Sequence, residues 1–419
     1  MKDRLAFVTT ILSNGMKVYS QYDSSVAFAH VSLIAPVGSA HNHGKIIPGS
    51  FHYLEHLLMK RSELYPQKGS LKEKVSLLGG RFGAGTWFGK TSYDLTATTE
   101  NLPDLFKGLV SHFFNPIILQ EDVIAERGVI ANERNRKSPF YPGTNERTQY
   151  LGSQWVNDEL YSVNQIFGSD EDFEGMTVEY FTKLHSDYYK TNKSYCVIIG
   201  NFDLDSICKE LSQYELKSNA VFPVEQFIPR VWNKRNYHEV VTKETNRFEY
   251  YTTSLFPINM QEAMNYLRLF SLSSAILTDY SYGVLMQWLR HEKNWCYEIS
   301  VNHAVVRGSA GGGFMIPLNS ATQVAEVRKE LLERIFNGLS QEDLLTKARQ
   351  HKKNLAVFWY QTMESRMSSA LKDLHIYGSI ENEQEYFDSL DAITTDNLLN
   401  FFHERLKSNF GELLFVPGK

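Results

Sequence analysis

The sequence predicts an α+β protein of two homologous domains, each a mostly antiparallel sheet packed against helices. Three observations support this prediction. The chain of 419 residues is too long for a single hydrophobic core, which favours two domains. Strand-like and helix-like segments are mixed along it, with short hairpin-like connections such as GTWFGKTS. The two halves also contain similar segments in the same order, which indicates an internal duplication.

The duplication is seen in two pairs of segments. TVEYFTKLHSDYYKTNKSYCVIIGN, from Thr177, aligns without gaps on TDNLLNFFHERLKSNFGELLFVPGK, from Thr395. HFFNPIILQED, from His112, precedes the first of these and matches RIFNGLSQED, from Arg334, which precedes the second. Each longer segment reads as a threonine-capped helix, a turn, an apolar strand and a glycine.

The boundary between the two copies is predicted in a segment that has no sustained helical period. ELKSNAVFPVEQFIPRVWNKRNYHEV, residues 215–240, carries two prolines and mixed polarity, which is typical of a linker. We therefore expect a first domain over 1–215, a linker over 216–240 and a second domain over 241–419.

Within each domain, alternating apolar residues predict strands, and apolar residues at helical spacing predict helices. In the first half, we expect strands near 7–12, 16–22, 28–36, 81–88 and 92–99, and helices near 49–61, 101–114, 120–137, 143–156 and 177–189. In the second half, we expect strands near 246–255, 296–306 and 312–317, and helices near 260–278, 281–292, 322–337 and 341–375.

Composition and charge narrow the function classes. A net charge of −5 predicts no electrostatic attraction to nucleic acid or to an anionic membrane. No apolar stretch approaches the length of a membrane span, and MKDRLAFVTTILSNGMKV lacks the pattern of a secretory signal. Cys196, Cys208 and Cys296 are odd in number and scattered, which is typical of a reducing compartment. We therefore expect a soluble, cytoplasmic protein.

The segment HYLEH, residues 52–56, is the strongest candidate for chemistry. On a helix, His52 and His56 project from the same face one turn apart, and Glu55 stands at its edge. Zinc binds neutral imidazoles, and a hydrolytic zinc site takes three protein ligands and leaves one position for water. A nearby carboxylate such as Glu55 can then accept the proton of that water. The alternative is the solvated face of an ordinary helix.

A third ligand is predicted on the helix LQEDVIAERGVIANERNRK. Glu126 and Glu133 are seven residues apart and therefore share a face, while Val123 and Ile130 anchor the helix. The two glutamates lie roughly 10 Å apart along the axis, so only one can bind the metal. The other is free to accept the far N–H of a ligand histidine and fix its orientation. Either glutamate alone would be read as part of a solvated face.

Together these residues resemble the inverzincins, the pitrilysin/insulinase family of zinc metallopeptidases that includes the mitochondrial processing peptidase type. The family signature is His-x-x-Glu-His followed some 77 residues later by a glutamate, and Glu133 follows His56 by 77 residues. The resemblance implies one zinc ion per chain, with His52, His56 and Glu133 as ligands. It also implies Glu55 as general base and Glu126 as the supporting carboxylate.

The resemblance extends over nearly the whole chain, through LSNGMKV, VGSA, FTKLHSDYYKTN and GVLMQWLRHEKNWCYEIS. The last of these resembles the family's Arg and Tyr element and implies catalytic roles for Arg290 and Tyr297. A guanidinium and a phenol can both donate hydrogen bonds to the scissile carbonyl as it gains negative charge. Without the resemblance, Arg290 would be read as a surface charge and Tyr297 as a core aromatic residue.

The chain departs from the family pattern in the segment RFGAGTWF. Gly83 stands where the family usually has asparagine, and Ala84, Gly85 and Thr86 follow it. The predicted strand is a plausible edge to which a substrate peptide adds by main-chain hydrogen bonds. Gly83 offers no side-chain amide, which changes how the substrate backbone is held, and strand glycines also mark bulges or close backbone approaches.

These features predict a zinc-dependent endopeptidase that cleaves short or unfolded peptides. The longer relatives contain four such domains, so a chain with two is expected to form a homodimer or a heterodimer with a paralogous chain. In the family geometry, Arg290 and Tyr297 complete the site of the facing chain. Two alternatives remain open: a non-catalytic or partner-dependent subunit of a heterodimeric processing peptidase, and a metal hydrolase of non-peptide substrates.

Overall fold

The computed structural model describes residues 6–42, 46–87, 89–137, 166–214, 237–242, 245–306, 309–380, 383–407 and 410–418. The chain forms two compact units, which are described separately. One comprises Met1–Glu225 with Met363–Leu371, and the other comprises Gln226–Thr362 with Lys372–Lys419. Within the described part of the chain, no helix is long and apolar enough to cross a membrane.

The first unit is built on a mixed sheet, whose strand order is β1-β2-β6-β3-β5-β4 over the described residues. The pairing is antiparallel except between β2 and β6, which run parallel. The strands are Val8–Ile11 (β1), Lys17–Tyr22 (β2), Phe28–Ala35 (β3), Arg81–Thr86 (β4), Thr91–Thr98 (β5) and Tyr195–Gly200 (β6). Strand β4 therefore forms one edge of this sheet.

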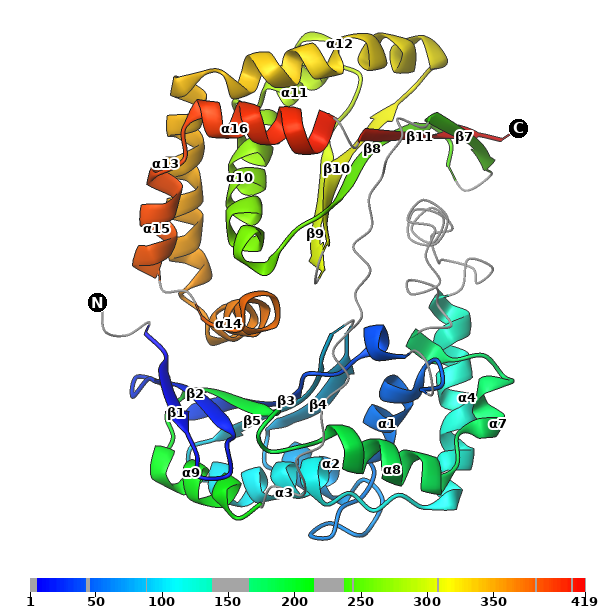
Figure 1. The fold of residues 1–419 in the computed structure, drawn as a ribbon, viewed down its shortest axis with the longest axis vertical. Helices are drawn as coiled ribbons and strands as arrows, with labels where there is room; N and C mark the ends of the chain where they lie inside the picture. The colour runs from blue at the N-terminus through cyan, green and yellow to red at the C-terminus, as the bar shows by residue number, and fades with distance from the viewer. Residues whose placement is uncertain are drawn as a thin grey trace. The chain divides into compact units, whose positions relative to one another are not determined.

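The helices of the first unit pack on one face of the sheet (Figure 1). They are Ser50–Leu58 (α1), Ser70–Leu77 (α2), Leu102–Phe114 (α3), Gln120–Lys137 (α4), Asp172–Gly175 (α7), Val178–Tyr188 (α8) and Leu204–Ser212 (α9). Because side chains alternate along a strand, Val31 and Leu33 of β3 join the hydrophobic core under the helices. His30 and Ser32 of the same strand lie on the opposite face.

The second unit repeats the plan of the first. Among its described residues the strand order is β7-β11-β8-β10-β9, with β7 and β11 parallel and the other pairs antiparallel. Strands β2 to β6 and strands β7 to β11 thus follow the same path through their sheets. The strands are Tyr237–Thr242 (β7), Phe248–Pro257 (β8), Ser300–Val306 (β9), Ser309–Leu318 (β10) and Phe410–Pro417 (β11). The predicted α+β fold and its internal duplication are confirmed.

The helices of the second unit enclose a hydrophobic core of their own. They are Met260–Thr278 (α10), Val284–Met286 (α11), Ala321–Leu339 (α12), Glu342–Trp359 (α13), Met363–Tyr377 (α14), Glu383–Asp391 (α15) and Thr395–Phe401 (α16), with π-helical turns over Gln287–Glu292 and Phe402–Lys407. Helix α14 begins in the residues assigned to the first unit.

Several predicted elements differ from the structure in their bounds. The helix expected over 341–375 is two helices, α13 and α14, because the chain turns at 360–362, where neither glycine nor proline marks a break. The helix expected over 281–292 is the short α11 followed by a π-helical turn. The helix expected over 143–156 lies outside the described residues. Thr394, rather than Thr395, caps α16.

Other elements were absent from the prediction. Helix α2 has a short, polar sequence with a weak helical period. Helix α9 was missed although Ile207 and Leu211 lie four residues apart on its buried face and Asp203 caps it. Strand β7 occupies residues 237–242, so the last residues of the predicted linker belong to a sheet. Its pairing partner β11 lies at the far end of the chain, and such a long-range contact leaves no local signal.

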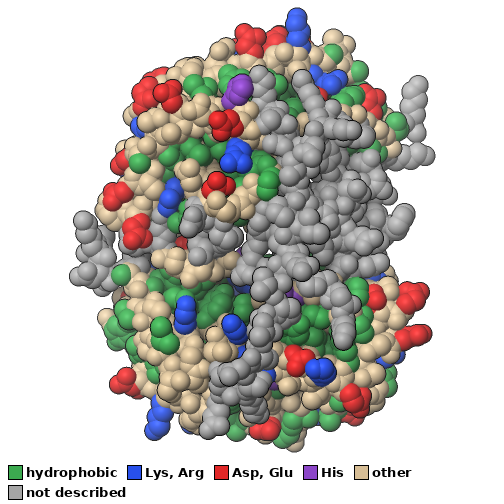
Figure 2. All heavy atoms as spheres, viewed as in Figure 1, with side chains coloured by type: hydrophobic (Ala, Val, Ile, Leu, Met, Phe, Trp, Pro, Cys, Tyr) green, Lys and Arg blue, Asp and Glu red, His purple; other side chains and the backbone are tan. Residues whose placement is uncertain are grey.

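Charged side chains of both signs are interspersed over the described residues on the face shown in Figure 2. The sequence has 43 basic and 48 acidic residues, so its two charge types are nearly balanced. On this face the described charges therefore form no single field of one sign.

Candidate metal centre

Helix α1 holds the two motif histidines in place. Its apolar side chains Phe51, Leu54 and Leu58 are fully buried, and burial of each contributes about 1.5–3 kcal/mol. His52 and His56 lie one turn apart on its other side, with ring centroids 4.7 Å apart. The packing of the apolar side therefore fixes the direction in which both imidazoles point.

Glu133 of α4 lies against both rings. Its Oε2 atom is 3.5 Å from His52 Nε2 and 3.7 Å from His56 Nε2. One ligand atom from each of the three residues lies within 4.8 Å of the others. A tetrahedral zinc ion with bonds of about 2.1 Å places neighbouring ligand atoms roughly 3.4 Å apart. The two distances from Glu133 are close to this value, so the three residues could hold a metal ion.

The protonation of His52 suits metal binding. Burial, and to a lesser extent the charge of His56, lowers the pKa of His52 to about 3. The imidazole is consequently neutral at pH 7, which is the form that binds a metal. Its Nδ1 atom is buried and has no hydrogen-bond partner among the described residues.

Glu126 orients the second histidine. Its Oε2 atom lies 2.9 Å from His56 Nδ1, and its Oε1 atom lies 2.6 Å from Lys60 Nζ. Burial raises the pKa of Glu126, but the hydrogen bonds from His56 and Lys60 outweigh burial and hold it below its usual value. The carboxylate thus fixes His56 through Nδ1 and leaves Nε2 facing Glu133.

Glu55 is buried beside the histidines and contacts the end of strand β4. The hydroxyl of Thr86 donates a hydrogen bond of 2.9 Å to Glu55 Oε2. Burial raises the pKa of Glu55 to about 7, although the charge of His56 and the Thr86 hydrogen bond lower it. A carboxylate with a pKa near neutrality can both accept and return a proton at physiological pH.

Strand β4 brings the four predicted substrate-binding residues to the edge of the sheet. Gly83, Ala84, Gly85 and Thr86 pair with β5 on one side only within the described residues. A Cβ atom built on Gly83 would have no neighbour within 4 Å among the residues that the structure describes. At Gly85 the Trp87 ring comes within 2.6 Å of the corresponding position, so a side chain there would require this exposed ring to move.

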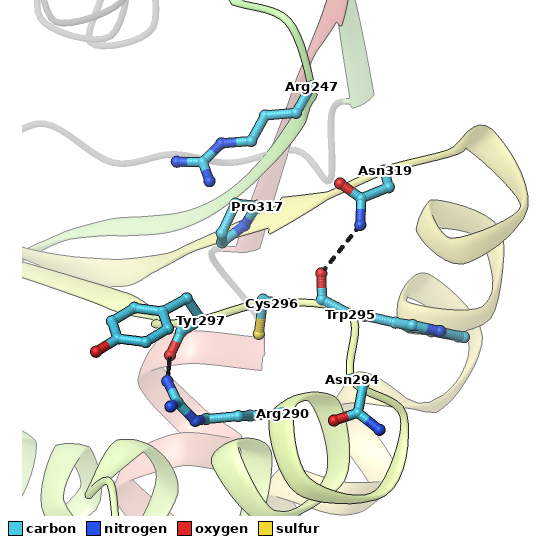
Figure 3. Close-up of a pocket in the computed structure, with 8 residues that line it drawn as sticks. All are labelled: Arg247, Arg290, Asn294, Trp295, Cys296, Tyr297, Pro317 and Asn319. Carbon is cyan, nitrogen blue, oxygen red and sulfur yellow. Dashed lines mark hydrogen bonds between the residues drawn. The ribbon is translucent and has the colours of Figure 1, made fainter.

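Arg290 and Tyr297 lie together in the second unit (Figure 3). The Arg290 guanidinium lies over the Tyr297 ring at 4.1 Å and over the Tyr280 ring at 4.2 Å, and it donates a hydrogen bond to the Tyr297 carbonyl. Tyr297 is 72% exposed, so the alternative interpretation as a core residue is wrong. With Arg247 and Cys296, the pair lines a pocket of about 400 Å³.

Sequence reasoning missed three contacts that position the site. Lys60 pairs with Glu126, and Thr86 holds Glu55. Tyr53 donates a hydrogen bond to the carbonyl of Val123 and thereby ties α1 to α4. Lys60 stands four residues after His56, just beyond the end of α1, and the helix predicted over 49–61 would have placed the two side chains on one face. The other two contacts join distant segments, and no local pattern indicates them.

The fold and the residues assembled on it define a class of protein: a duplicated two-unit α+β chain whose first unit carries a histidine, histidine and glutamate group able to hold a metal. Comparison of the sequence with family models gives the family. Residues 17–150 match the model described as "Insulinase (Peptidase family M16)", and residues 175–350 match "Peptidase M16 inactive domain". The chain belongs to the M16 peptidase family.

Individual relatives agree with this assignment. Protease 3 of Escherichia coli (strain K12) is 27% identical over 216 residues, which are 50% of this chain and 22% of that protein. Zinc protease PqqE of Helicobacter pylori is 26% identical over 210 residues, 49% of this chain and 46% of the relative. The matched part therefore spans less than half of either relative's length.

A solved structure supports the fold. The crystal structure of a protease from Helicobacter pylori superposes with a TM-score of 0.81 at 16% identity, and the match covers 98% of this chain and 99% of that one. The duplicated architecture is thus shared along the whole length of both chains.

Proposed function

We propose that the chain is a zinc-dependent endopeptidase that cleaves short or unfolded peptides. The observation that carries the proposal is the convergence of His52, His56 and Glu133, whose ligand atoms lie within 4.8 Å of one another. Zinc, when bound, would polarise the peptide carbonyl and lower the pKa of a water molecule. Membership of a peptidase family and the similarity to PqqE, named a zinc protease, support this assignment.

The proton transfers are assigned to Glu55. This carboxylate takes a proton from the attacking water and returns it to the nitrogen of the departing peptide, which balances the hydrolysis. The Thr86 hydrogen bond fixes the orientation of the carboxylate for both steps. Glu126 keeps His56 in the tautomer that presents Nε2 to the metal.

The substrate peptide is proposed to pair with the free edge of β4. Residues 83–86 supply main-chain donors and acceptors along that edge, and Thr86 at its end contacts Glu55. A peptide strand added there would pass the site where the proton is transferred. Because only main-chain groups are used, this pairing accepts many sequences but requires an extended, unfolded segment.

Pairing of two chains is part of the proposal. Arg290 and Tyr297 are assigned to stabilise the oxyanion in the site of a facing chain, which is either a second copy or a paralogous chain. The greater length of Protease 3, of which the match covers 22%, leaves room for further units of this kind. A homodimer predicts activity from this chain alone, and a heterodimer predicts activity only after the paralogue is added.

The test compares the native chain with Glu55→Gln for zinc content and for cleavage of a mixed peptide library. We expect the variant to keep zinc and to lose about 10²–10⁴-fold in rate, as is typical when a general base is removed. Glu121→Gln on the exposed surface of α4 is the matched control and should retain cleavage. Cleavage retained by Glu55→Gln, or a native chain that binds no zinc, would contradict the proposal.

A further inference from the structure

The cavity of the second unit has a part that the proposed mechanism does not use. Arg290 and Tyr297 line it together with Arg247, Asn294, Trp295 and Cys296 (Figure 3). Its volume of about 400 Å³ is within the range of ligand pockets, about 300–1,000 Å³, and far exceeds the ~30 Å³ of a water molecule. The cavity therefore has room for a side chain or a chain end of a peptide, besides the carbonyl assigned to Arg290 and Tyr297.

Two irregularities of the backbone bring the lining residues together. Arg290 lies in the π-helical turn Gln287–Glu292, and π-helical turns are frequent at functional sites. Asn294 has a φ of 55° and is the only non-glycine residue of the described chain with a positive φ. Asparagine adopts this left-handed conformation more readily than most residues. The chain thereby turns back, and residues 296 and 297 return beside Arg290 (Figure 3).

The guanidinium of Arg290 is held in one position before any ligand binds. It lies over the rings of Tyr280 and Tyr297, 4.2 and 4.1 Å from their centroids, and one of its N–H groups donates to the Tyr297 carbonyl. A guanidinium carries five N–H donors, so further donors remain for a ligand. Because the group is already ordered, little conformational entropy is lost when an anion binds it.

Arg247 adds a second cation to the same cavity. The hydroxyl of Thr245 accepts a hydrogen bond of 3.2 Å from its N–H and donates one of 3.0 Å to its carbonyl, which fixes the backbone there. The Arg247 side chain is exposed and forms no ion pair within 4.0 Å among the described residues. The carboxylate of Glu249, two residues along the chain, accepts hydrogen bonds from Thr245 and Tyr251 instead.

The two guanidiniums make the cavity selective for an anion. Burial raises the pKa of the Cys296 thiol to about 11, and the charges of Arg290 and Arg247 lower it to a smaller extent, so both charges act at the same wall. Two cations at one cavity repel each other, and an anion between them removes this cost. A carboxylate can accept two parallel N–H bonds from a guanidinium, and such bonds are roughly twice as strong as neutral ones. The carboxylate is also the anionic group that peptides carry.

We propose that this cavity binds a carboxylate of the substrate peptide, with Arg247 as the residue that determines specificity. The carboxylate belongs either to an aspartate or glutamate side chain or to the end of the peptide, since both offer the same group to a guanidinium. This inference rests on the proposed function, because the cavity lies at the scissile bond only if Arg290 and Tyr297 contact its carbonyl. The substrate class is therefore peptides with a carboxylate near the bond that is cleaved.

The experiment uses one ten-residue peptide, acetylated at its amino end and amidated at its carboxyl end, in which each position in turn is glutamate or glutamine. For the native chain, we expect one position at which glutamate exceeds glutamine about tenfold in kcat/KM. Arg247→Gln should bring this ratio close to one. Arg247→Glu should favour lysine over glutamine at the same position, a reversal that a merely structural role for Arg247 would not produce.

A second pair of peptides identifies the source of the carboxylate. Both contain only glutamine at the tested positions, and they end in a free acid or in an amide. A gain of the free acid over the amide that Arg247→Gln removes would place the end of the peptide in the cavity. Lys347→Gln removes an exposed positive charge from α13 of the same unit and should leave every ratio unchanged. No gain from either carboxylate, or a gain that survives Arg247→Gln, would overturn the inference.

Binding separates failure of this inference from failure of the proposed function. The affinity of the native chain for the same peptides, labelled with a fluorophore, is measured by fluorescence anisotropy. Tighter binding of a carboxylate peptide that depends on Arg247, without any cleavage, would support the role of the cavity while contradicting the proposed peptidase activity. Equal binding of glutamate and glutamine peptides, and of free acid and amide, would overturn the inference whether or not cleavage occurs.

Discussion

Single residues decide whether the three proposed ligands can hold a metal, and Glu126 is the most informative of them. Glu126 is not one of the three proposed ligands. Its carboxylate instead forms a hydrogen bond with His56 and an ion pair with Lys60. A carboxylate in this position both sets the histidine tautomer and increases its basicity. We therefore expect Glu126 to contribute to affinity for the proposed metal ion and not to the proton transfers.

Glu126→Gln should weaken zinc binding by about 10–100-fold, because a neutral amide orients His56 less strongly and leaves Lys60 without its partner. Competition with a chelator of known affinity measures this change. Glu121→Gln on the same helix is the control and should bind zinc as the native chain does. Unchanged affinity in Glu126→Gln would show that His56 is oriented by other contacts.

At the scale of residues, the spacing of motif residues predicted the candidate metal ligands, which composition alone could not do. The spacing of four between His52 and His56, together with Glu133 at a distance of 77 residues, indicated the three residues that the structure brings together. Thr86 was expected at the substrate-binding edge, but its hydrogen bond to Glu55 was not predicted. This contact depends on cross-strand register, which follows from tertiary pairing and not from local pattern.

At the scale of elements, the entry of the chain into α1 decides where the metal residues lie. Gly49 caps this helix with a φ of 82°, and a Cβ atom there would come within 2.3 Å of the Gly168 backbone nitrogen. Both the left-handed conformation and the close approach require glycine. The start of α1 is thereby held against the segment that precedes α7.

Gly49→Ala should destabilise the chain by about 3 kcal/mol or more, since the strain of a left-handed alanine, about 1–2 kcal/mol, adds to a backbone clash. Gly69→Ala is a matched control. Gly69 caps α2 with a φ of 74°, but nothing lies within 4 Å of its added Cβ atom, so it should lose only about 1–2 kcal/mol. Urea denaturation measures both. Equal losses of stability in the two variants would show that the backbone around Gly168 rearranges without an energetic cost.

The predicted bounds of α1 and α3 are nearly those observed, because apolar residues repeat at helical spacing along both helices. Helix α4 also has its predicted bounds, with Val123 and Ile130 buried on one face. The division between α13 and α14 was missed because α13 continues to Trp359 with no breaking residue before the turn. Strand β7 was missed because its stability comes from β11, a partner far along the chain.

For the whole molecule, the proposed zinc ion would join α1 and α4 of one unit only. Each unit has its own hydrophobic core, so stabilisation by the metal should stay mainly in the first. At a free zinc concentration about 1,000 times Kd, ligand binding adds about 4.1 kcal/mol to the stability of the state that binds it.

Hydrogen exchange followed by mass spectrometry measures this effect along the chain. Adding zinc to the chelator-treated protein should slow exchange in peptides from α1 and α4, with little change in peptides from α10 and α12. Glu133→Gln should show no zinc-dependent protection, because one of the three ligands is lost. Protection of equal size in both units would show that the metal stabilises the molecule as one cooperative body.

The matching strand paths of the two sheets show which segments of the two units correspond to each other. The connection from β3 to β4 contains α1 with its histidines, and the corresponding connection from β8 to β9 contains α10, which has no histidine, followed by Arg290 and Tyr297. The internal duplication thus places α1 of the first unit and α10 of the second in corresponding positions, although only α1 carries the two histidines. Transferring the two histidines of α1 to the corresponding positions of α10 would test whether the shared strand arrangement is enough to bind a metal. The alternative is that the other contacts of the first unit are also needed.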